Sequence, residues 1–203
     1  MTKTKLAFIC ILILAINGLA QNRLEELSVN EMMRSSLTAG TNVKDEKAIG
    51  GFAPSGNAPK KIDASDVFLP NVIMLVADPE TPAVFDQKYR GIRLLLLNTT
   101  EKEAWFPAVD SRMYIIQEAI DTDGKWKPVE AFPASWCGNS YHRVQLGSNE
   151  YWEFSAPLYH GRFKTKIRFR LGQDVRGAVY SNEFDGSVNP GQFTNKPKSP
   201  WGD

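Results

Sequence analysis

Residues 162–171 read RFKTKIRFRL, and this stretch decides the fold class. Cations alternate with mostly apolar residues, and successive side chains of a β-strand point to opposite faces. The stretch therefore predicts a strand with a core face and a water face. The core face comprises Phe163, Thr165, Ile167, Phe169 and Leu171. The water face comprises Arg162, Lys164, Lys166, Arg168 and Arg170.

The surrounding residues 66–190 continue this pattern of short strands separated by turns. Asp121-Thr122-Asp123-Gly124 lies between strand-like runs, and Asp-Gly favours a tight hairpin because both positions tolerate positive φ. Gly147-Ser148-Asn149 makes a second tight connection, and the run 178–184 should return beside residues 162–171. The other strand-like runs are 67–77, 91–97, 112–120, 125–131, 141–146 and 150–155. Seven or eight strands predict an all-β fold, an antiparallel sandwich.

The first twenty residues have the layout of a cleaved secretory signal peptide. Lys3 and Lys5 precede the apolar run Leu6–Ile16, and small residues stand before Gln21. The run is too short for a membrane span, which needs about 20 apolar residues. We therefore expect a secreted or periplasmic protein, either free or associated with the cell surface, with no transmembrane segment after cleavage. Cleavage also removes Cys10 and leaves Cys137 as the single cysteine.

Net charge argues against a nucleic-acid partner. The chain of 203 residues has 24 Lys and Arg against 23 Asp and Glu, a net charge of +1. Removing Lys3 and Lys5 from the 24 cations leaves 22 against 23 anions. A protein that binds nucleic acid by charge needs a surplus of cations to neutralise phosphates. We therefore expect a protein or glycan partner outside the cytoplasm, and no cofactor.

The segments on either side of the predicted sandwich have a different character. Leu24, Leu27 and Leu37 suggest a short amphipathic helix between residues 23 and 36. Residues 40–59 are rich in Gly, Pro, Ser and Asn, which predicts a flexible linker up to residue 65. Residues 191–203 contain Pro197 and Pro200 and suggest a loose tail. We therefore expect one sandwich at 66–190 with appendages.

Three features in the sandwich region carry a resemblance to a known family. They are the Asn98-Thr99-Thr100 turn after an apolar strand, the strand 161–171, and Tyr180-Ser181-Asn182 behind it. In this order they resemble an immunoglobulin-like or fibronectin type III-like domain. The stretches WCGNS (136–140), YWEF (151–154) and YSNEF (180–184) also resemble uncharacterised secreted bacterial proteins. The resemblance implies architecture rather than activity, and the inter-sheet disulfide of antibody domains is absent.

Two groups of side chains are candidates for a binding surface. The five cations Arg162, Lys164, Lys166, Arg168 and Arg170 could meet an acidic partner or an anionic glycan. Trp136, Tyr151 and Trp152 could stack on sugar rings if they are exposed. Each group also has a plainer interpretation. The cations could simply be the solvated face of a strand, and the aromatics could be packed in the core.

Signatures of catalysis and metal binding are weak. Cys137 with His142 or His160 could serve as a nucleophile and base, but sequence does not place them together. The same residues make a poor metal set, and Asp121-Thr122-Asp123-Gly124 fits a hairpin better than a calcium loop. We therefore expect an exported, non-catalytic binding or structural-interaction protein. The alternatives are a carbohydrate-binding module that uses exposed aromatics and an unrecognised hydrolase that uses Cys137.

Overall fold

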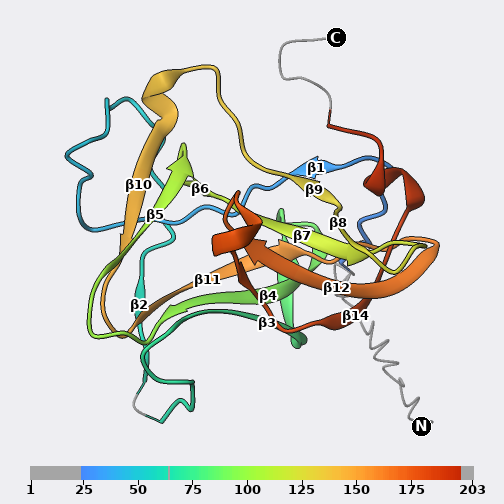
Figure 1. The fold of residues 1–203 in the computed structure, drawn as a ribbon, viewed down its shortest axis with the longest axis horizontal. Coiled ribbons are helices and arrows are strands. Elements are labelled where there is room, and N and C mark those ends of the chain that lie inside the picture. Colours follow the sequence, from blue (N-terminus) through green and yellow to red (C-terminus); the bar gives the residue numbers. More distant parts are fainter. Residues whose placement is uncertain (1–23, 64, 198–203) are drawn as a thin grey trace, which may run out of the picture.

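The computed structural model describes residues 24–63 and 65–197, and these residues form a mostly antiparallel all-β structure compatible with a β-sandwich (Figure 1). The predicted signal peptide lies outside the described residues. Three short 3-10 helices are the helical elements of the described ranges: η1 (Gly138–Ser140), η2 (Val175–Gly177) and η3 (Pro190–Phe193). No helix in these ranges is long and apolar enough to cross a membrane.

One large sheet, here called the β4 sheet, has the order β2-β11-β4-β3. Its strands are β2 (Lys60–Lys61), β11 (Glu150–Pro157), β4 (Tyr89–Asn98) and β3 (Ile73–Phe85), all paired antiparallel. Leu94, Leu95, Leu96 and Leu97 are all buried, so β4 is covered on both faces. The predicted runs 67–77 and 91–97 correspond to β3, which begins at Ile73, and to β4.

The second large sheet, the β12 sheet, contains the stretch that predicts the fold class. Its strands are β13 (Val179–Tyr180), β12 (Phe163–Leu171), β14 (Phe184–Val188), β7 (Ile115–Ile120) and β8 (Trp126–Pro128). The hairpin at residues 121–124 joins β7 to β8, with Gly124 at φ 74° and the Asp121 N–H donating to Lys125 O at 2.9 Å. The predicted return after residue 178 is also confirmed, because β13 and β14 both pair antiparallel with β12.

Two smaller sheets complete the described structure. β10 (Tyr141–Leu146) pairs with β5 (Ala104–Val109), which pairs with β6 (Arg112–Met113). The short connection at residues 147–149 carries the chain from this sheet to β11 of the β4 sheet. β1 (Met33–Arg34) runs parallel to β9 (Glu130–Ala131).

The core joins the two large sheets. A single cluster of buried side chains includes Leu94 and Leu96 of the β4 sheet together with Ile167 and Phe169 of the β12 sheet. Burying such side chains contributes about 1.5–3 kcal/mol each. This shared core explains why the described chain needs no disulfide, since Cys137 is its one cysteine and is free.

Residues 24–39, here called the strap, are extended and do not form the predicted helix. Glu25 bridges to Tyr89, Leu27 to Tyr159 and Thr38 to Arg112, and β1 lies between them. Leu27 and Leu37 are both buried, but they reach the core at positions far apart along an extended chain. The helical spacing of the leucines is therefore overridden by tertiary pairing.

Residues 40–59 and 191–195 also differ from the expected flexible linker and loose tail. The Gly40 N–H donates to Asn57 O at 2.8 Å, and the buried Trp152 donates from Nε1 to Gly40 O at 2.9 Å. At the other end, the Gly191 N–H donates to Asn30 Oδ1 at 3.0 Å, and Gln192 is fully buried. Hydrogen bonds to Asn57, to Trp152 of β11 and to Asn30 of the strap hold these segments in place despite their Gly- and Pro-rich composition.

Candidate functional site

Arg168 points to the outer face of the β12 sheet, as the alternation predicts, but other side chains cover it. Its guanidinium lies 4.1 Å from the ring centroid of Trp126 and 4.0 Å from that of Tyr180. Its Nε and Nη2 donate to one carboxylate oxygen of Glu118 at 3.0 and 2.9 Å. The Arg168 side chain keeps only 19% exposure, so little of its charge reaches solvent.

The prediction that Arg170 lies on the water face is wrong. Arg170 is buried, at 6% exposure, and its Nε lies 2.7 Å from the other oxygen of Glu118. Its Nη1 donates to the carbonyls of Gly172 and Gln173, both at 3.2 Å. A buried guanidinium is stable only with such partners. Glu118 lies on β7 opposite Arg168, two residues from the position opposite Arg170, and no local sequence pattern predicts this pairing. Lys166 pairs with Asp185 at 2.8 Å, while Arg162 and Lys164 are exposed.

The three candidate aromatics do not form one surface. Trp152 is fully buried and packs edge-on against Phe106, so it is core and cannot stack on a ligand. Tyr151 is half-buried beside Lys60, whose Nζ lies 5.9 Å from its ring centroid. Trp136 is 76% exposed in the loop before η1. Of the candidate set, Trp136 alone offers a widely exposed ring.

The histidines have partners other than Cys137. His142 stacks on Phe52 at 3.7 Å, and its Nε2 accepts from the Ser111 N–H at 2.9 Å. Burial lowers the pKa of His142, which fits the neutral ring that this bond requires. His160 pairs with Glu26 at 3.2 Å. Among residues 24–63 and 65–197, no group of three or more His, Cys, Asp or Glu could hold a metal ion.

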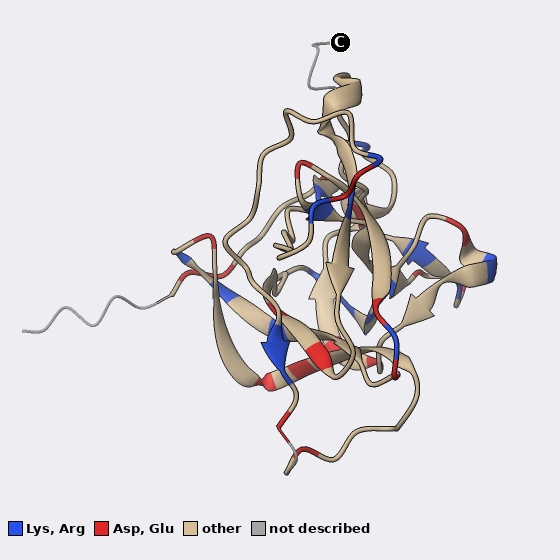
Figure 2. Ribbon diagram, turned by 90° about the vertical axis from the view of Figure 1, so that its left-hand side faces the viewer, with Lys and Arg blue, Asp and Glu red and all other residues tan. Residues whose placement is uncertain are grey.

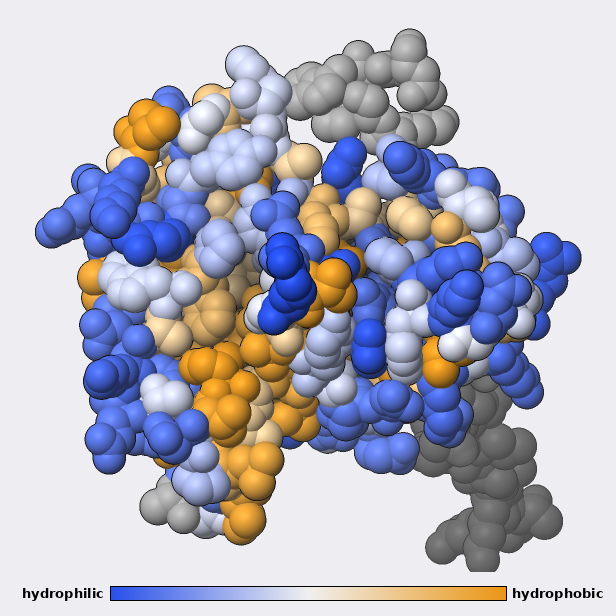
Figure 3. All heavy atoms as spheres, in the orientation of Figure 1, coloured by the Kyte–Doolittle hydropathy of each residue, from blue (hydrophilic) through white to orange (hydrophobic). Residues whose placement is uncertain are grey.

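Acidic and basic residues are distributed over the ribbon rather than gathered on one face (Figure 2). Large apolar side chains are exposed at one edge, before β3, where Val67 is 96% and Leu69 is 66% exposed (Figure 3). Neither pattern by itself defines a site.

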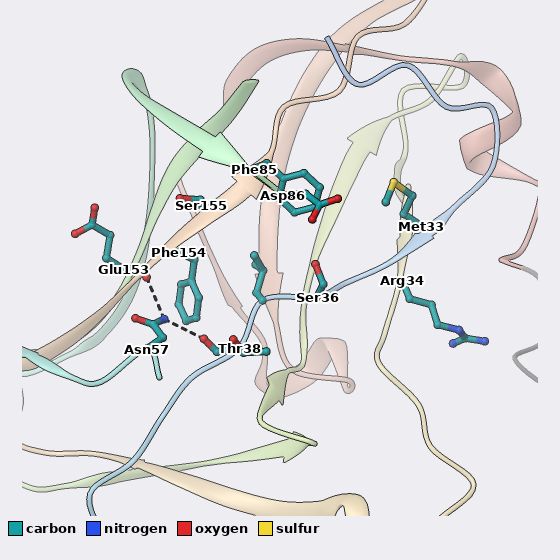
Figure 4. A pocket seen from close by; sticks show the side chains of 11 residues that line it. Met33, Arg34, Ser36, Thr38, Asn57, Phe85, Asp86, Glu153, Phe154 and Ser155 are labelled. Atoms are coloured by element: carbon teal, nitrogen blue, oxygen red, sulfur yellow. Dashed lines mark hydrogen bonds between the residues drawn. The ribbon is translucent and has the colours of Figure 1, made fainter. Parts of the chain in front are cut away.

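An open groove of about 600 Å³ lies between the strap and the β4 sheet (Figure 4). One wall is β11 at Glu153, Phe154 and Ser155, and the facing wall is the strap. The β3–β4 turn closes one end. The lining residues are Met33, Arg34, Ser36, Leu37, Thr38, Asn57, Phe85, Asp86, Glu153, Phe154 and Ser155. Its volume falls in the usual range of ligand pockets, about 300–1,000 Å³.

Asn57 fixes the distance between the two walls. Its Nδ2 donates to Thr38 O on the strap at 2.9 Å and to Glu153 O on β11 at 3.0 Å. Leu37 holds the strap against the core, because its side chain is buried there and its carbonyl accepts a hydrogen bond from the Met113 N–H at 2.8 Å. The groove is therefore a formed feature with walls held by hydrogen bonds and apolar packing.

The turn at the end of the groove has an unusual backbone. Asp86 and Gln87 lie at φ 49° and 58°, and the Lys88 N–H donates to Phe85 O at 3.2 Å. Asp86 and Gln87 are the central residues of a β-turn inside the three-residue loop between the paired Phe85 and Tyr89, and both are left-handed, a conformation that favours Asn-Gly or Asp-Gly. Left-handed non-glycine residues cost of order 1 kcal/mol each. The turn places the Asp86 carboxylate at the lip of the groove (Figure 4).

Some polar side chains of the groove have partners within the protein, and others do not. Glu153 is paired with Lys60 at 2.8 Å and with Arg93 at 3.5 Å, and the Lys60 contact lowers the pKa of its carboxyl. The Arg34 guanidinium turns away and donates to Phe132 O (Figure 4). In contrast, the side chains of Ser36, Asp86 and Ser155 are exposed and have no hydrogen bond within the described chain.

The groove therefore offers hydrogen-bonding groups beside an apolar floor. The unfilled groups are mainly acceptors, and Phe85 and Met33 supply apolar surface next to them. Sequence reasoning missed this site because its residues come from four separate segments. The one local sign is an alternating strand that ends in Phe85-Asp86, but the turn lacks the glycine that marks most such hairpins.

A scan against protein-family models, a search of curated proteins and a search of solved structures each find no match to this chain. The function must therefore be inferred from the side chains themselves.

Proposed function

We propose that the protein is an exported binding protein, non-catalytic, that takes a carbohydrate in the groove between the strap and β11. The carbohydrate chemistry refines the broader expectation of a protein or glycan partner. The proposed contact surface differs from the two surfaces expected from the sequence: the groove takes the place of the cations of β12 and of the aromatic set Trp136, Tyr151 and Trp152.

The observation that carries this proposal is the set of unfilled hydrogen-bonding groups around Phe85. Sugars present hydroxyl donors and acceptors on their edges and C–H bonds on their faces. The Asp86 carboxylate and the Ser36 and Ser155 hydroxyls match the edges, and the partly buried Phe85 ring matches a face. An uncharged sugar fits better than an anionic one, because Asp86 is the acid of the groove with no cationic partner.

Three finer proposals accompany this function. Export rests on the layout of residues 1–20, which is typical of a cleaved signal peptide. An origin as a secreted bacterial protein rests on the resemblance of the WCGNS, YWEF and YSNEF stretches. An immunoglobulin-like or fibronectin type III-like type is supported by two antiparallel sheets that share one core. The hydrolase alternative is not proposed, because no contact in the described chain joins Cys137 to His142 or His160, whose partners include Ser111 and Glu26.

The test is a binding screen of the mature chain against neutral and anionic oligosaccharides, followed by calorimetry on the ligands found. Asp86→Asn keeps the volume and the left-handed backbone but removes the charge. Because a hydrogen bond to a charged group contributes about 1.5–3 kcal/mol, this variant should bind at least about tenfold more weakly.

The matched control is Asp123→Asn, which changes an exposed aspartate at the tip of the β7–β8 hairpin, outside the groove lining. This variant should bind like the parent. If no oligosaccharide binds, or if the two variants bind equally well, the groove is not a carbohydrate site.

A further inference from the structure

A second pocket, here called the Phe132 pocket, also borders β1. It holds about 390 Å³ and is bordered by β1, β7, the β8–β9 region and residues 196–197. Arg34 borders both cavities, and Figure 4 shows its guanidinium directed away from the groove. The Met32 N–H donates to Asn195 O at 2.9 Å, which holds the C-terminal border against the strap.

The walls of the Phe132 pocket are mainly apolar. Ile116 forms part of its inner side and is 1% exposed, and Met32 and Pro128 lie beside it. The Phe132 ring is partly buried and is fixed by its neighbour Tyr114, whose ring centroid is 5.7 Å away. A ligand here would meet a rigid aromatic surface, so an apolar group would gain from leaving water.

Positive charge surrounds these apolar walls. Arg170 lies with its guanidinium 5.1 Å from the Phe132 ring centroid, and it shares the single carboxylate of Glu118 with Arg168. Two guanidinium groups and one carboxylate leave a surplus of one positive charge. Arg34 has one hydrogen bond, from Nη1 to Phe132 O at 3.2 Å, and Lys196 is exposed with no ion pair in the described chain.

The acid that borders the pocket makes its hydrogen bonds to interior residues and forms no ion pair with the cations of the pocket. Glu130 is buried at 3% exposure, and its carboxyl accepts hydrogen bonds from Tyr159 Oη at 2.7 Å and from the Gln117 N–H at 2.8 Å. Both partners lie in the interior rather than at the pocket mouth. The described cations near the opening therefore lack a carboxylate of their own.

We propose that the Phe132 pocket binds a small amphiphilic carboxylate, with its apolar body against Phe132 and Ile116 and its carboxylate paired with Arg34 and Lys196. The planar fork of arginine suits a carboxylate, and a lysine at the rim adds a second charge. This site does not depend on the carbohydrate groove, because its ligand is an anion rather than an uncharged sugar and because Arg34 is the one residue that lines both cavities.

The experiment measures calorimetric binding of decanoate to the mature chain, below its micelle-forming concentration. Decan-1-ol, with the same apolar body and no charge, is the reference ligand. Decanoate should bind at least about tenfold more tightly than decanol, because the alcohol lacks the ion pairs. Equal binding of the two compounds would overturn the proposal.

Variants separate the charged contacts from the fold. Arg34→Gln and Lys196→Gln should each reduce decanoate affinity about fivefold to tenfold and leave decanol binding unchanged. Lys196 is exposed, so its variant tests the proposal even if Arg34→Gln unfolds the strap. Lys164→Gln, an exposed cation on β12 outside the pocket, is the control. An equal loss in Lys164→Gln would show a general charge effect and contradict the site.

Discussion

The carboxyl group of Glu130 lies in the interior with three hydrogen-bond donors around it. Besides Tyr159 Oη and the Gln117 N–H, the Gln117 side-chain amide donates at 3.3 Å. Burial raises the pKa of Glu130 from its ordinary value of 4.5 to about 7, although these three donors act in the opposite direction. A carboxyl group therefore changes charge in the core close to neutral pH.

This residue gives the protein a stability that depends on pH. Between pH 4.5 and 7 the folded state binds a proton that the unfolded state has lost. The contribution of Glu130 to the free energy of unfolding is fully present below pH 4.5 and is lost as pH rises through 7. The total loss is about 3 kcal/mol. Glu130→Gln should remove this loss, as measured by denaturant unfolding at pH 5 and pH 8.

Comparing the parent protein with Glu130→Gln separates the pH dependence due to Glu130 from that due to His142. Burial lowers the pKa of His142, so its contribution is present above pH 6.5 and is lost as pH falls. That effect is common to parent and variant and cancels in their difference. A difference that stays constant from pH 5 to pH 8 would show that Glu130 is ionised throughout this range.

At the scale of elements, strand β12 shows what alternation predicts well and where it stops. Ile167 and Phe169 are buried, and Lys164 and Lys166 are exposed, as a period of two requires. Arg170 is the exception, because Glu118 on β7 and Phe132 lie over its end of the strand. Alternation assigns a face of the sheet, but whether that face meets water depends on segments far away in sequence.

Three substitutions along β12 test this register. Phe169→Ala should cost about 3–5 kcal/mol, because it leaves a cavity in the shared core. Arg168→Ala should cost about 2 kcal/mol, since it removes two ring contacts and leaves Glu118 with one cation. Lys164→Ala should cost under about 0.5 kcal/mol. Thermal or urea melts measure all three, and an equal cost for Lys164 and Phe169 would mean that the register is wrong.

The candidate groove shows a different limit of sequence reasoning. The strands and the 121–124 hairpin follow from local patterns, whereas the groove requires the strap, Asn57, the Phe85-Asp86 turn and β11 to meet. No spacing in the sequence encodes that meeting. The leucines of the strap even suggest a helix, because helical spacing and contact with two separate sheets produce the same pattern of apolar residues.

At the scale of the whole molecule, the strap and the residues after it bind the sheets into one body. The Ser35 N–H donates to Ala131 O, the Ala39 N–H to Ser111 O and the Met113 N–H to Leu37 O, all within 2.9 Å. Ala39 is fully buried, and Leu37 lies in the same core cluster as Phe169. The hydrogen bonds reach β9 and the sheet of β5, β6 and β10, and the buried side chains reach the core that the β4 and β12 sheets share. The strap should therefore unfold with the sandwich rather than before it.

Native-state hydrogen exchange tests this cooperation directly. The Ser35 and Ala39 amides should exchange only by global unfolding, with the same free energy as amides in the β4–β11 ladder. Leu37→Ala should lower both free energies together, by about 2–5 kcal/mol, because the lost side chain belongs to the common core. Leu69→Ala, which changes a side chain that is 66% exposed, should lower neither by more than about 0.5 kcal/mol. Two results would contradict this prediction: strap amides that exchange with a much smaller free energy than the ladder amides, and a Leu37→Ala effect confined to the strap. Together they would show that the strap detaches without unfolding of the sheets. The groove would then lose one wall without unfolding, and ligand affinity would depend on how often the strap is docked.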